Sequence, residues 1–254
     1  MMDMITDPKF WDDYWQHVSE WENVDMRRSY DRCFDQVFRR WLAPGPQVRL
    51  MEIGCAPGRW LIYFHQQFGY QVSGCDSAPH AVEVTRANLQ QANVPGSVLL
   101  ADLMSGSLPA AVYDRVVSLG IIEHFADPWP ALEQHVRLIA PGGTLVLEMP
   151  NYTGLNRWLL QRGSHQLLEA HNTRIMHLPF LREVAARFGL TPRFTGYIGG
   201  FEPGLWDGTG QRFFLRQGVR VANLARRTLR FFDRVNHPFF SGYLMGIYQK
   251  LEAA

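Results

Sequence analysis

The sequence predicts an α/β fold in which helices cover both faces of a mostly parallel β-sheet. Between residues 48 and 150, short apolar runs alternate with segments whose apolar residues recur every three or four positions. This alternation is typical of consecutive βα units. The first apolar run also ends in a glycine-rich turn before a helical pattern begins, a junction that recurs in doubly wound folds.

Strands and helices are expected in a regular order along the chain. Apolar runs predict strands over residues 48–53, 71–75, 97–101, 115–119, 144–149, 193–198 and 242–250. Helical spacing predicts helices over residues 60–68, 78–91, 128–139 and 179–188. In the third of these helices Leu132, Val136 and Ile139 share one face. Residues 141–143, Pro-Gly-Gly, are expected as a structural turn before the fifth strand.

Three regions lie outside this regular core. Residues 1–45 are expected to form a helical, aromatic segment that closes over the site. Residues 46–254 are expected to form one domain with added segments at 151–177 and 199–240, which would shape the substrate pocket. Residues 212–235 combine helical apolar spacing with many arginines, which predicts a basic amphipathic helix. Such a helix packs on its own domain, on a second subunit or on a membrane.

Composition narrows the classes of function. The 254 residues are 46% hydrophobic and 19% charged, with a net charge of +1. This balance excludes general disorder and gives no global attraction to nucleic acid or anionic membranes. No apolar stretch approaches the roughly 20 residues of a spanning helix, so no stable membrane insertion is expected. Cys33, Cys55 and Cys75 lack the spacing of a disulfide framework or a zinc site, and a cytoplasmic protein is expected.

The most informative segment is residues 50–59, Leu-Met-Glu-Ile-Gly-Cys-Ala-Pro-Gly-Arg, where a strand meets the glycine-rich turn. Gly54 and Gly58 let a ligand approach the backbone closely and permit a positive φ. The second predicted strand ends beside Asp76, a position where a carboxylate accepts hydrogen bonds from ribose hydroxyls. Together these features predict a nucleoside-binding site.

The turn departs from the dinucleotide-binding pattern G-x-G-x-x-G, because Ala56 and Arg59 stand where that pattern has glycine. It resembles instead motif I of the class I S-adenosylmethionine-dependent methyltransferases, E/D-x-G-x-G-x-G. Glu52, Gly54 and Gly58 match this motif, and Ala56 replaces its middle glycine. The resemblance implies a Rossmann-like sheet of seven strands with an antiparallel last strand, and S-adenosylmethionine as the cofactor.

The resemblance continues to about residue 150. It implies that Asp76 binds the ribose and that Asp102 meets the adenine amino group, although either carboxylate would also suit a helix N-cap. Residues 118–125 are similar to the segment after strand four in ubiquinone O-methyltransferase-like enzymes, and residues 138–145 to the turn before strand five. The expected cofactor-binding residues are Glu52, Gly54, Ala56, Gly58, Asp76, Ser77, Asp102, Leu103, Leu119 and Trp11.

Aromatic residues crowd the N-terminal region, above all in residues 10–15, Phe-Trp-Asp-Asp-Tyr-Trp. This run is similar to Trp-containing segments that close over the cofactor in several small-molecule methyltransferases. An aromatic face beside a sulfonium is also favoured by cation–π attraction. The alternative is a helix that packs its aromatic face on the core.

Three residues are the catalytic candidates: His124, His171 and Glu123. His124 follows the fourth strand, where the methyl group should emerge, and an imidazole ordinarily titrates near neutrality. It is therefore expected to act as the base for a hydroxyl acceptor, with a loop or pocket-wall histidine as the alternative. Glu123 is expected to orient His124, bind a metal or form a surface ion pair. His171 or His177 is expected to bind the acceptor or act as a base, and no metal site is predicted in their segment, which also carries His165 and Glu169.

These features predict an enzyme that transfers a methyl group from S-adenosylmethionine to a small-molecule acceptor. O-methylation is favoured over N-methylation, in secondary-metabolite, quinone or glycan biosynthesis. The alternatives are a non-catalytic scaffold that acts through a partner, and a nucleic-acid methyltransferase. The amino-methylating enzymes of the latter class carry an N/D-P-P-Y/F-like motif where this chain reads Gly-Ile-Ile-Glu at residues 120–123. No nucleic-acid partner is expected, and a homodimer is the protein assembly considered.

Overall fold

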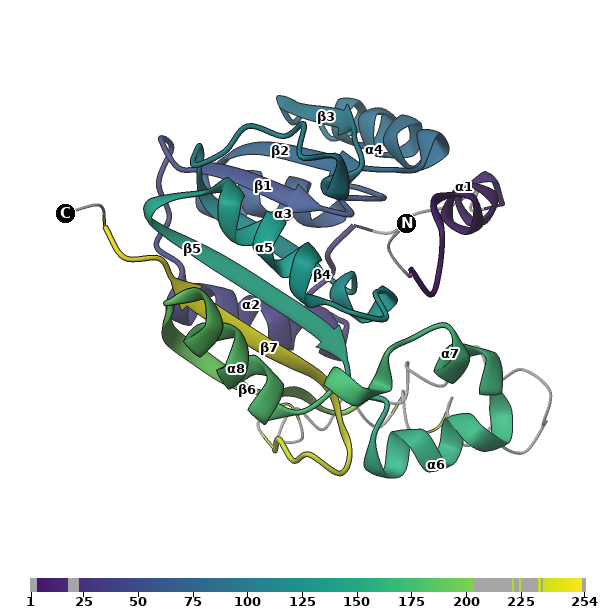
Figure 1. The fold of residues 1–254 in the computed structure, drawn as a ribbon. Coiled ribbons are helices and arrows are strands. Elements are labelled where there is room, and N and C mark those ends of the chain that lie inside the picture. Colours follow the sequence, from purple (N-terminus) through teal and green to yellow (C-terminus); the bar gives the residue numbers. More distant parts are fainter. Residues whose placement is uncertain are drawn as a thin grey trace.

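The computed structural model has a seven-stranded β-sheet between two layers of helices in the part of the chain that it describes (Figure 1). These residues are 4–17, 23–202 and 235–252, together with the single residues 221, 224 and 233. The strand order is β3-β2-β1-β4-β5-β7-β6. The first five strands are parallel, and β7 is antiparallel to both β5 and β6. The predicted Rossmann-like fold with an antiparallel last strand is confirmed.

The order of the strands creates a switch point at β1. The strands are β1 (Arg49–Ile53), β2 (Gln71–Asp76), β3 (Gly96–Leu100), β4 (Tyr113–Leu119), β5 (Ile139–Pro150), β6 (Thr191–Phe201) and β7 (Ser241–Gln249). At the carboxyl end of β1, Ile53 pairs with Cys75 of β2 on one side and with Ser118 of β4 on the other. Ligands of open α/β sheets bind outside the carboxyl ends of the strands at such a point.

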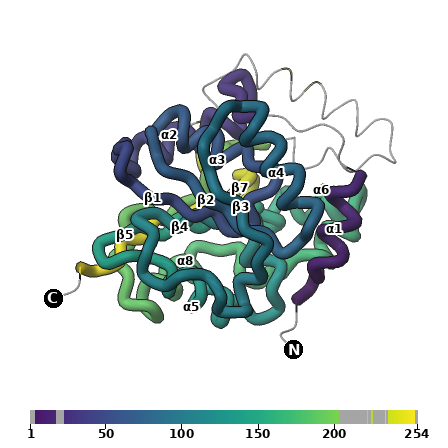
Figure 2. The backbone as a smooth tube through the Cα atoms, turned by 90° about the horizontal axis from the view of Figure 1, so that it is seen from above, coloured from purple at the N-terminus to yellow at the C-terminus, as the bar shows by residue number. Residues whose placement is uncertain are grey.

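Helices cover both faces of the sheet. They are α1 (Pro8–Gln16), α2 (Ser29–Trp41), α3 (Arg59–Phe68), α4 (Pro79–Gln91), α5 (Trp129–Leu138), α6 (Gly154–Gly163), α7 (His165–Glu169) and α8 (Leu178–Phe188), with single 3₁₀ turns η1 (Leu103–Ser105), η2 (Ile122–His124) and η3 (Thr173–Ile175). Seen from above, α2, α3 and α4 lie on one face of the sheet, and α5 and α8 lie on the other (Figure 2). Each face buries its own apolar cluster.

Helix α2 belongs to this core, although the sequence prediction set residues 1–45 apart from it. Phe34 and Phe38 of α2 are fully buried and pack with Trp60 and Phe64 of α3. The surrounding arginines and aspartates of α2 conceal this apolar face in the sequence, because charged residues fill its other side. The core therefore extends toward the N-terminus as far as α2.

Two strands extend beyond their predicted ranges at both ends. β5 begins at Ile139, so the Pro-Gly-Gly segment lies within the strand as an irregularity, with Gly142 at φ +71°. β6 continues to Phe201, because Gly199 and Gly200 adopt positive φ and absorb a register shift against β7. The inserted segment predicted at 199–240 therefore starts inside a strand. Glycines that accommodate a bulge are easily interpreted as turns from sequence alone.

The structure describes the first of the two added segments in full and the second only in part. Residues 151–177 contain α6, α7 and η3, which lie beyond the carboxyl end of β5 (Figure 1). The basic helix predicted at 212–235 falls almost entirely outside the described residues. Among the residues that are described, no helix has the length and apolar character needed to cross a membrane.

Candidate active site

The glycine-rich turn follows β1 and forms a narrow bend at the carboxyl end of this strand. Gly54 and Gly58 adopt φ of +66° and +88°, values that favour glycine. The amides of Gly54 and Cys55 donate to the carbonyl oxygen of Cys75 at 2.9 and 3.2 Å, which ties the bend to β2. Gly58 then precedes the first turn of α3. The predicted strand–turn–helix junction is therefore present, and it presents backbone rather than side chains to the space above.

Gly54 also marks a close approach between two loops. A Cβ atom at this position would lie 2.8 Å from Cγ1 of Ile121, in the loop after β4. A Cβ at Gly58 would lie 3.0 Å from Cγ2 of Thr85, in α4. Both glycines are thus required by packing, but only Gly54 faces the ligand side, because Gly58 serves the contact between α3 and α4.

A cavity of about 180 Å³ opens beside this bend. Its walls come from the loops after β1, β2, β3 and β4 and from the N-terminal segment. The lining residues are Met4, Trp11, Trp15, Ile53, Gly54, Ala56, Cys75, Asp76, Ser77, Ala101, Asp102, Leu103, Leu119, Gly120, Ile121, His124 and Phe125. Of the ten expected cofactor-binding residues, all except Glu52 and Gly58 line the cavity.

Asp76 and Asp102 supply the carboxylates of the cavity wall. The Oδ1 atom of Asp76 accepts from the amide of Ala78 at 3.1 Å. Burial raises the pKa of Asp76, opposed by hydrogen bonds from backbone amides at the turn and at the start of α4. Asp102 accepts a hydrogen bond from the amide of Met104 at 2.8 Å and thereby caps η1. Asp102 is thus an N-cap, as the alternative interpretation expects, and it also lines the cavity.

Glu52 lies beneath the cavity rather than in its wall. Its side chain is buried in β1, and its Oε2 atom has no hydrogen-bond partner within the described part of the chain. Burial raises the pKa of Glu52 well above its ordinary value, although the guanidinium of Arg59 opposes the shift. A buried oxygen without a partner indicates a site where a polar ligand group or a water completes the hydrogen bonding.

The N-terminal segment forms the outer wall. Met4 pairs with Phe125 in an antiparallel bridge, and the amide of Ile5 donates to the carbonyl oxygen of His124 at 2.8 Å. Helix α1 follows, and Trp11 and Trp15 line the cavity while none of the residues of α1 is buried. Trp11 and Trp15 thus face the cavity, in line with the first alternative, whereas Phe10 and Tyr14 lie on the surface and α1 buries no aromatic face in the core.

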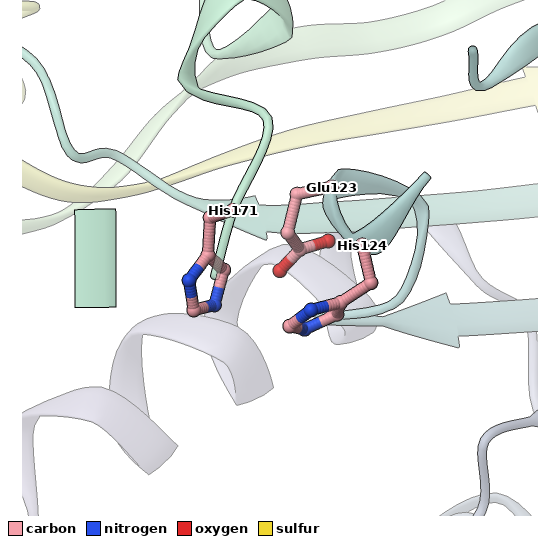
Figure 3. Close-up of side chains that lie close together, drawn as sticks. All are labelled: Glu123, His124 and His171. Atoms are coloured by element: carbon pink, nitrogen blue, oxygen red, sulfur yellow. The ribbon is translucent and has the colours of Figure 1, made fainter. Parts of the chain in front are cut away.

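Three polar side chains meet at one end of the cavity. Glu123 and His124 belong to η2, after β4, and His171 belongs to the loop after α7 (Figure 3). One ligand atom from each lies within 4.8 Å of the others. The imidazole rings of His124 and His171 pack against each other with their centroids 4.5 Å apart, and the carboxyl group of Glu123 lies beside them (Figure 3). The structure thus brings together the three predicted catalytic residues, of which His124 lines the cavity directly.

The tautomer of each imidazole follows from its hydrogen bonds. Nδ1 of His124 lies 3.1 Å from the carbonyl oxygen of Ala170, and Nδ1 of His171 lies 2.5 Å from that of Leu167. Nδ1 of His124 also lies 3.0 Å from the hydroxyl oxygen of Thr6. Because a carbonyl oxygen only accepts, the contacts with Ala170 and Leu167 place the proton of each ring on Nδ1, and each Nε2 keeps its lone pair. Burial, with the adjacent His171 adding to it, lowers the pKa of His124 to about 3. The imidazole is neutral at pH 7 but a weak proton acceptor, so the ordinary titration range assumed from sequence does not hold here.

Glu123 is buried, which removes the surface ion pair predicted as one of its roles. Its side chain is about 1% exposed. Burial raises the pKa of Glu123 to about 8. Its Oε2 atom finds no hydrogen-bond partner among the residues that the structure describes. The same loop is fixed by Asn172, whose amide donates to the carbonyl oxygen of Glu123 at 2.6 Å.

The remaining polar residues of 151–177 have structural roles. His165 and Glu169 form an exposed ion pair at 3.1 Å along α7. His177 caps α8, since its Nδ1 accepts from the amide of Phe180 at 3.1 Å. Of the four residues that formed the predicted polar cluster, His171 alone joins the site.

Several lining residues were not anticipated. Trp15 belongs to the aromatic run at residues 10–15, and Gly120, Ile121 and Phe125 belong to the segment 118–125 that resembles a known one, so these residues carried a signal. Met4 carried none, because its place depends on a bridge to Phe125, more than a hundred residues away in sequence. Hydrophobic residues of that kind are indistinguishable from core residues until the fold is known.

Residues 14–193 match the model of a methyltransferase domain family. The chain belongs to this methyltransferase family. The class I methyltransferase resemblance and the enzyme class predicted from the sequence are thereby confirmed. The match begins in α1 and ends in β6, so it covers the glycine-rich turn, the cavity wall except Met4 and Trp11, and the segment with α6 and α7.

Individual relatives cover shorter stretches of this methyltransferase. It is 33% identical over 114 residues to an uncharacterized methyltransferase of Mycobacterium bovis, covering 45% of this chain and 56% of that protein. It is 30% identical over 121 residues to a ubiquinone biosynthesis O-methyltransferase of Xanthomonas campestris, covering 47% and 49%. The chain thus spans about half the length of these relatives. A phosphoethanolamine N-methyltransferase of Haemonchus contortus has the same fold, with a TM-score of 0.60, 15% identity and coverage of 85% of this chain and 52% of that one.

Proposed function

We propose that this methyltransferase transfers a methyl group from S-adenosylmethionine to a hydroxyl group of a small molecule. The observation that carries the proposal is the cavity at the switch point of the sheet. There the bend at Gly54 and the carboxylate of Asp76 stand side by side in one wall. A narrow backbone bend next to an acid at the end of β2 suits a nucleoside whose ribose hydroxyls need acceptors.

The residues present fit this cofactor along its length. Asp76 would accept hydrogen bonds from the ribose hydroxyls, and Asp102 with Leu103 would border the adenine. The unpartnered oxygen of Glu52 beneath the bend would be completed by the ammonium of the methionine part, directly or through water. When bound, S-adenosylmethionine supplies a methyl group on a positively charged sulfur. The structural relative from Haemonchus contortus is described in complex with S-adenosylhomocysteine, which supports the choice of cofactor.

The acceptor would enter beside Glu123, His124 and His171. These residues lie where the wall from the loop after β4 meets the segment after β5. Positioning of the acceptor close to the methyl group supplies much of the acceleration in such displacements. A hydroxyl acceptor must also lose a proton, and the polar trio is the part of the described cavity region suited to that demand. The O-methyltransferase among the relatives favours oxygen, whereas the structural neighbour acts on nitrogen.

Two measurements test this function in sequence. Isothermal titration with S-adenosylhomocysteine should give one site per chain, and incubation with S-adenosylmethionine and a panel of phenols and other hydroxylated small molecules should add one methyl group, seen by mass spectrometry. Binding without transfer to any acceptor would favour the scaffold alternative. No heat with either nucleoside would contradict the proposal altogether.

Replacement of Trp11 by alanine is expected to weaken S-adenosylhomocysteine binding about fivefold, because loss of an aromatic wall is worth about 1 kcal/mol. Trp11 lines the cavity and packs edge-on against His124, with ring centroids 5.0 Å apart. Phe10→Ala is the matched control, since Phe10 lies on the same helix but is 49% exposed and outside the wall. Equal losses in both variants, measured by titration calorimetry, would show that α1 acts only through its own packing.

The proposal also covers the character of the acceptor, the protein's partners and its location in the cell. We infer a small-molecule acceptor of apolar or aromatic character, because aromatic and aliphatic side chains dominate the wall. A net charge of +1 supports the expectation that nucleic acid is not the partner. A homodimer and a cytoplasmic location are proposed with it, and gel filtration and fractionation of cells would test them.

A further inference from the structure

The proposed function places a polar cluster at the acceptor end of the cavity without saying how it would remove the proton of a hydroxyl acceptor. Glu123, His124 and His171 each offer one ligand atom, and these atoms lie within 4.8 Å of one another. They come from two segments, η2 after β4 and the loop after α7. The two imidazole rings pack against each other with their centroids 4.5 Å apart, and no hydrogen bond joins the side chains of the three residues (Figure 3). Nitrogen and oxygen atoms gathered in this way suit a shared ligand such as a metal ion.

The hydrogen bonds around the cluster prepare both imidazoles for that partner. Each Nδ1 is engaged by a backbone carbonyl, that of Ala170 for His124 and that of Leu167 for His171. The proton is therefore on Nδ1, and the lone pair of Nε2 points elsewhere. Metal-binding histidines characteristically donate their second ring N–H to a carbonyl or carboxylate in this way, which fixes the tautomer and the ring orientation.

The carboxyl group of Glu123 lacks a partner. Glu123 is about 1% exposed, and its Oε2 atom has no hydrogen-bond partner within the described residues. A buried polar oxygen is costly unless a donor or a cation compensates it. Lys and Arg side chains form no salt bridge with Glu123 in the described region. A bound cation would displace the proton of this carboxyl group and complete the coordination of the three side chains.

The loops that carry the ligands are held together independently of any cation. The amide of Asn172 donates to the carbonyl oxygen of Glu123 at 2.6 Å. The side chain of Asn172 donates to the carbonyl oxygens of Phe125 and Ala126 at 3.1 and 3.0 Å. The residue next to His171 thus clamps its loop onto the one that carries Glu123 and His124. Such second-layer bonds give a ligand set a defined geometry before the ion arrives.

We propose that Glu123, His124 and His171 bind one divalent transition-metal cation, of the zinc type, at the acceptor end of the cavity. Two imidazole nitrogens and one carboxylate oxygen form a ligand set that suits Zn²⁺ and leaves a coordination position open. Ligand atoms about 2.1 Å from a tetrahedral ion lie roughly 3.4 Å apart, so the three side chains must close inward by about an ångström. This assignment replaces the sequence prediction that no metal is bound here.

The open coordination position would allow the cation to activate an acceptor hydroxyl. This step rests on the proposed function. An acceptor hydroxyl bound to the ion would have a lowered pKa. Its O–H bond would break with the electron pair left on oxygen, and the proton would pass to a water molecule. The cation would thus supply the activation of the hydroxyl, and His124 would serve as a ligand of the ion rather than as the base.

The test uses the full chain after treatment with a chelator, without nucleoside or acceptor. Titration calorimetry with Zn²⁺ is expected to show one site per chain. Glu123→Gln and His171→Ala should each weaken Zn²⁺ binding at least tenfold. His165→Ala is the matched control, because His165 is an exposed histidine of the same segment that lies outside the cluster, and its affinity should equal that of the unsubstituted chain. Circular dichroism checks that each variant is folded.

A second measurement keeps the proposal testable if a variant unfolds. Co²⁺ bound to the unsubstituted chain should give the visible absorption of a four- or five-coordinate site, and added Zn²⁺ should abolish it. Absence of Zn²⁺ binding, or equal binding by the cluster variants and the control, would overturn the metal site. Titration of the metal-free protein with S-adenosylhomocysteine separates the two proposals: zinc binding without nucleoside binding would overturn the proposed function and leave the metal site standing.

Discussion

Replacement of Asp76 by alanine is expected to weaken S-adenosylhomocysteine binding by about 100-fold or more. Two ribose hydroxyls would lose one charged acceptor, and hydrogen bonds to charged groups contribute about 1.5–3 kcal/mol each. A loss of about 3 kcal/mol corresponds to roughly two orders of magnitude in affinity. Titration calorimetry measures the change directly. Asp76→Asn, which keeps the shape but not the charge, should give an intermediate loss.

The fold should tolerate this substitution. Burial raises the pKa of Asp76, so the folded state favours its protonated form, and this preference contributes stability below the unfolded pKa that is lost as pH rises through the folded value. Loss of the hydrogen bond from the amide of Ala78 should cost the ligand-free Asp76→Ala chain about 1 kcal/mol at neutral pH. Asp114→Ala is the control, because Asp114 lies at the opposite end of β4 and accepts from Arg49. A similar loss of affinity in both variants would remove Asp76 from the ribose site.

Replacement of Gly54 by alanine is expected to lower the free energy of unfolding by about 2–5 kcal/mol. A left-handed backbone costs a residue with a Cβ about 1–2 kcal/mol, and overpacking against Ile121 adds about 1–3 kcal/mol. The contact is set by geometry, since the added Cβ would lie 2.8 Å from Cγ1 of Ile121. Chemical denaturation of the ligand-free protein measures the loss. The same Cβ would narrow the cavity, so nucleoside binding should weaken as well.

Gly106 provides a matched control for this experiment. Its φ of +68° nearly equals the +66° of Gly54, yet a Cβ there would have no described atom within 4 Å. Gly106→Ala should therefore show the backbone cost alone and leave nucleoside binding unchanged. Equal losses in the free energy of unfolding for both variants would show that the close approach of Ile121 to Gly54 adds no energetic cost. Packing would then not require glycine at position 54.

Sequence predicted most of the central sheet because local signals and global packing agree there. The glycine turn, the acid after β2 and the apolar runs each follow from short-range chemistry, and eight of the ten expected cofactor residues line the cavity. Glu52 and Gly58 do not, because one lies within β1 and the other supports the contact of α3 with α4. Adjacency in a motif does not reveal which side of the backbone faces the ligand.

The polar end of the cavity was harder to predict for a physical reason. Hydrogen bonds of Asn172, together with the bond of His124 to Ala170, join the loops that carry His124 and His171, and such long-range bonds leave no periodic pattern in the sequence. Burial then shifts the pKa of both histidines downward, an effect that depends on the finished fold. The residue types could be chosen in advance, but their protonation and partners could not.

The loops at the carboxyl ends of the strands form two groups, and the two groups come from different parts of the chain. Loops after β1, β2 and β3 lie on one side of the switch point, and the loop after β4 with the segment beyond β5 lies on the other. A change in the length or composition of residues 151–177 does not alter the loops after β1, β2 and β3 or the strands that precede them. Under the proposed function, a change in residues 151–177 would therefore alter the choice of acceptor without altering the residues proposed to hold the cofactor.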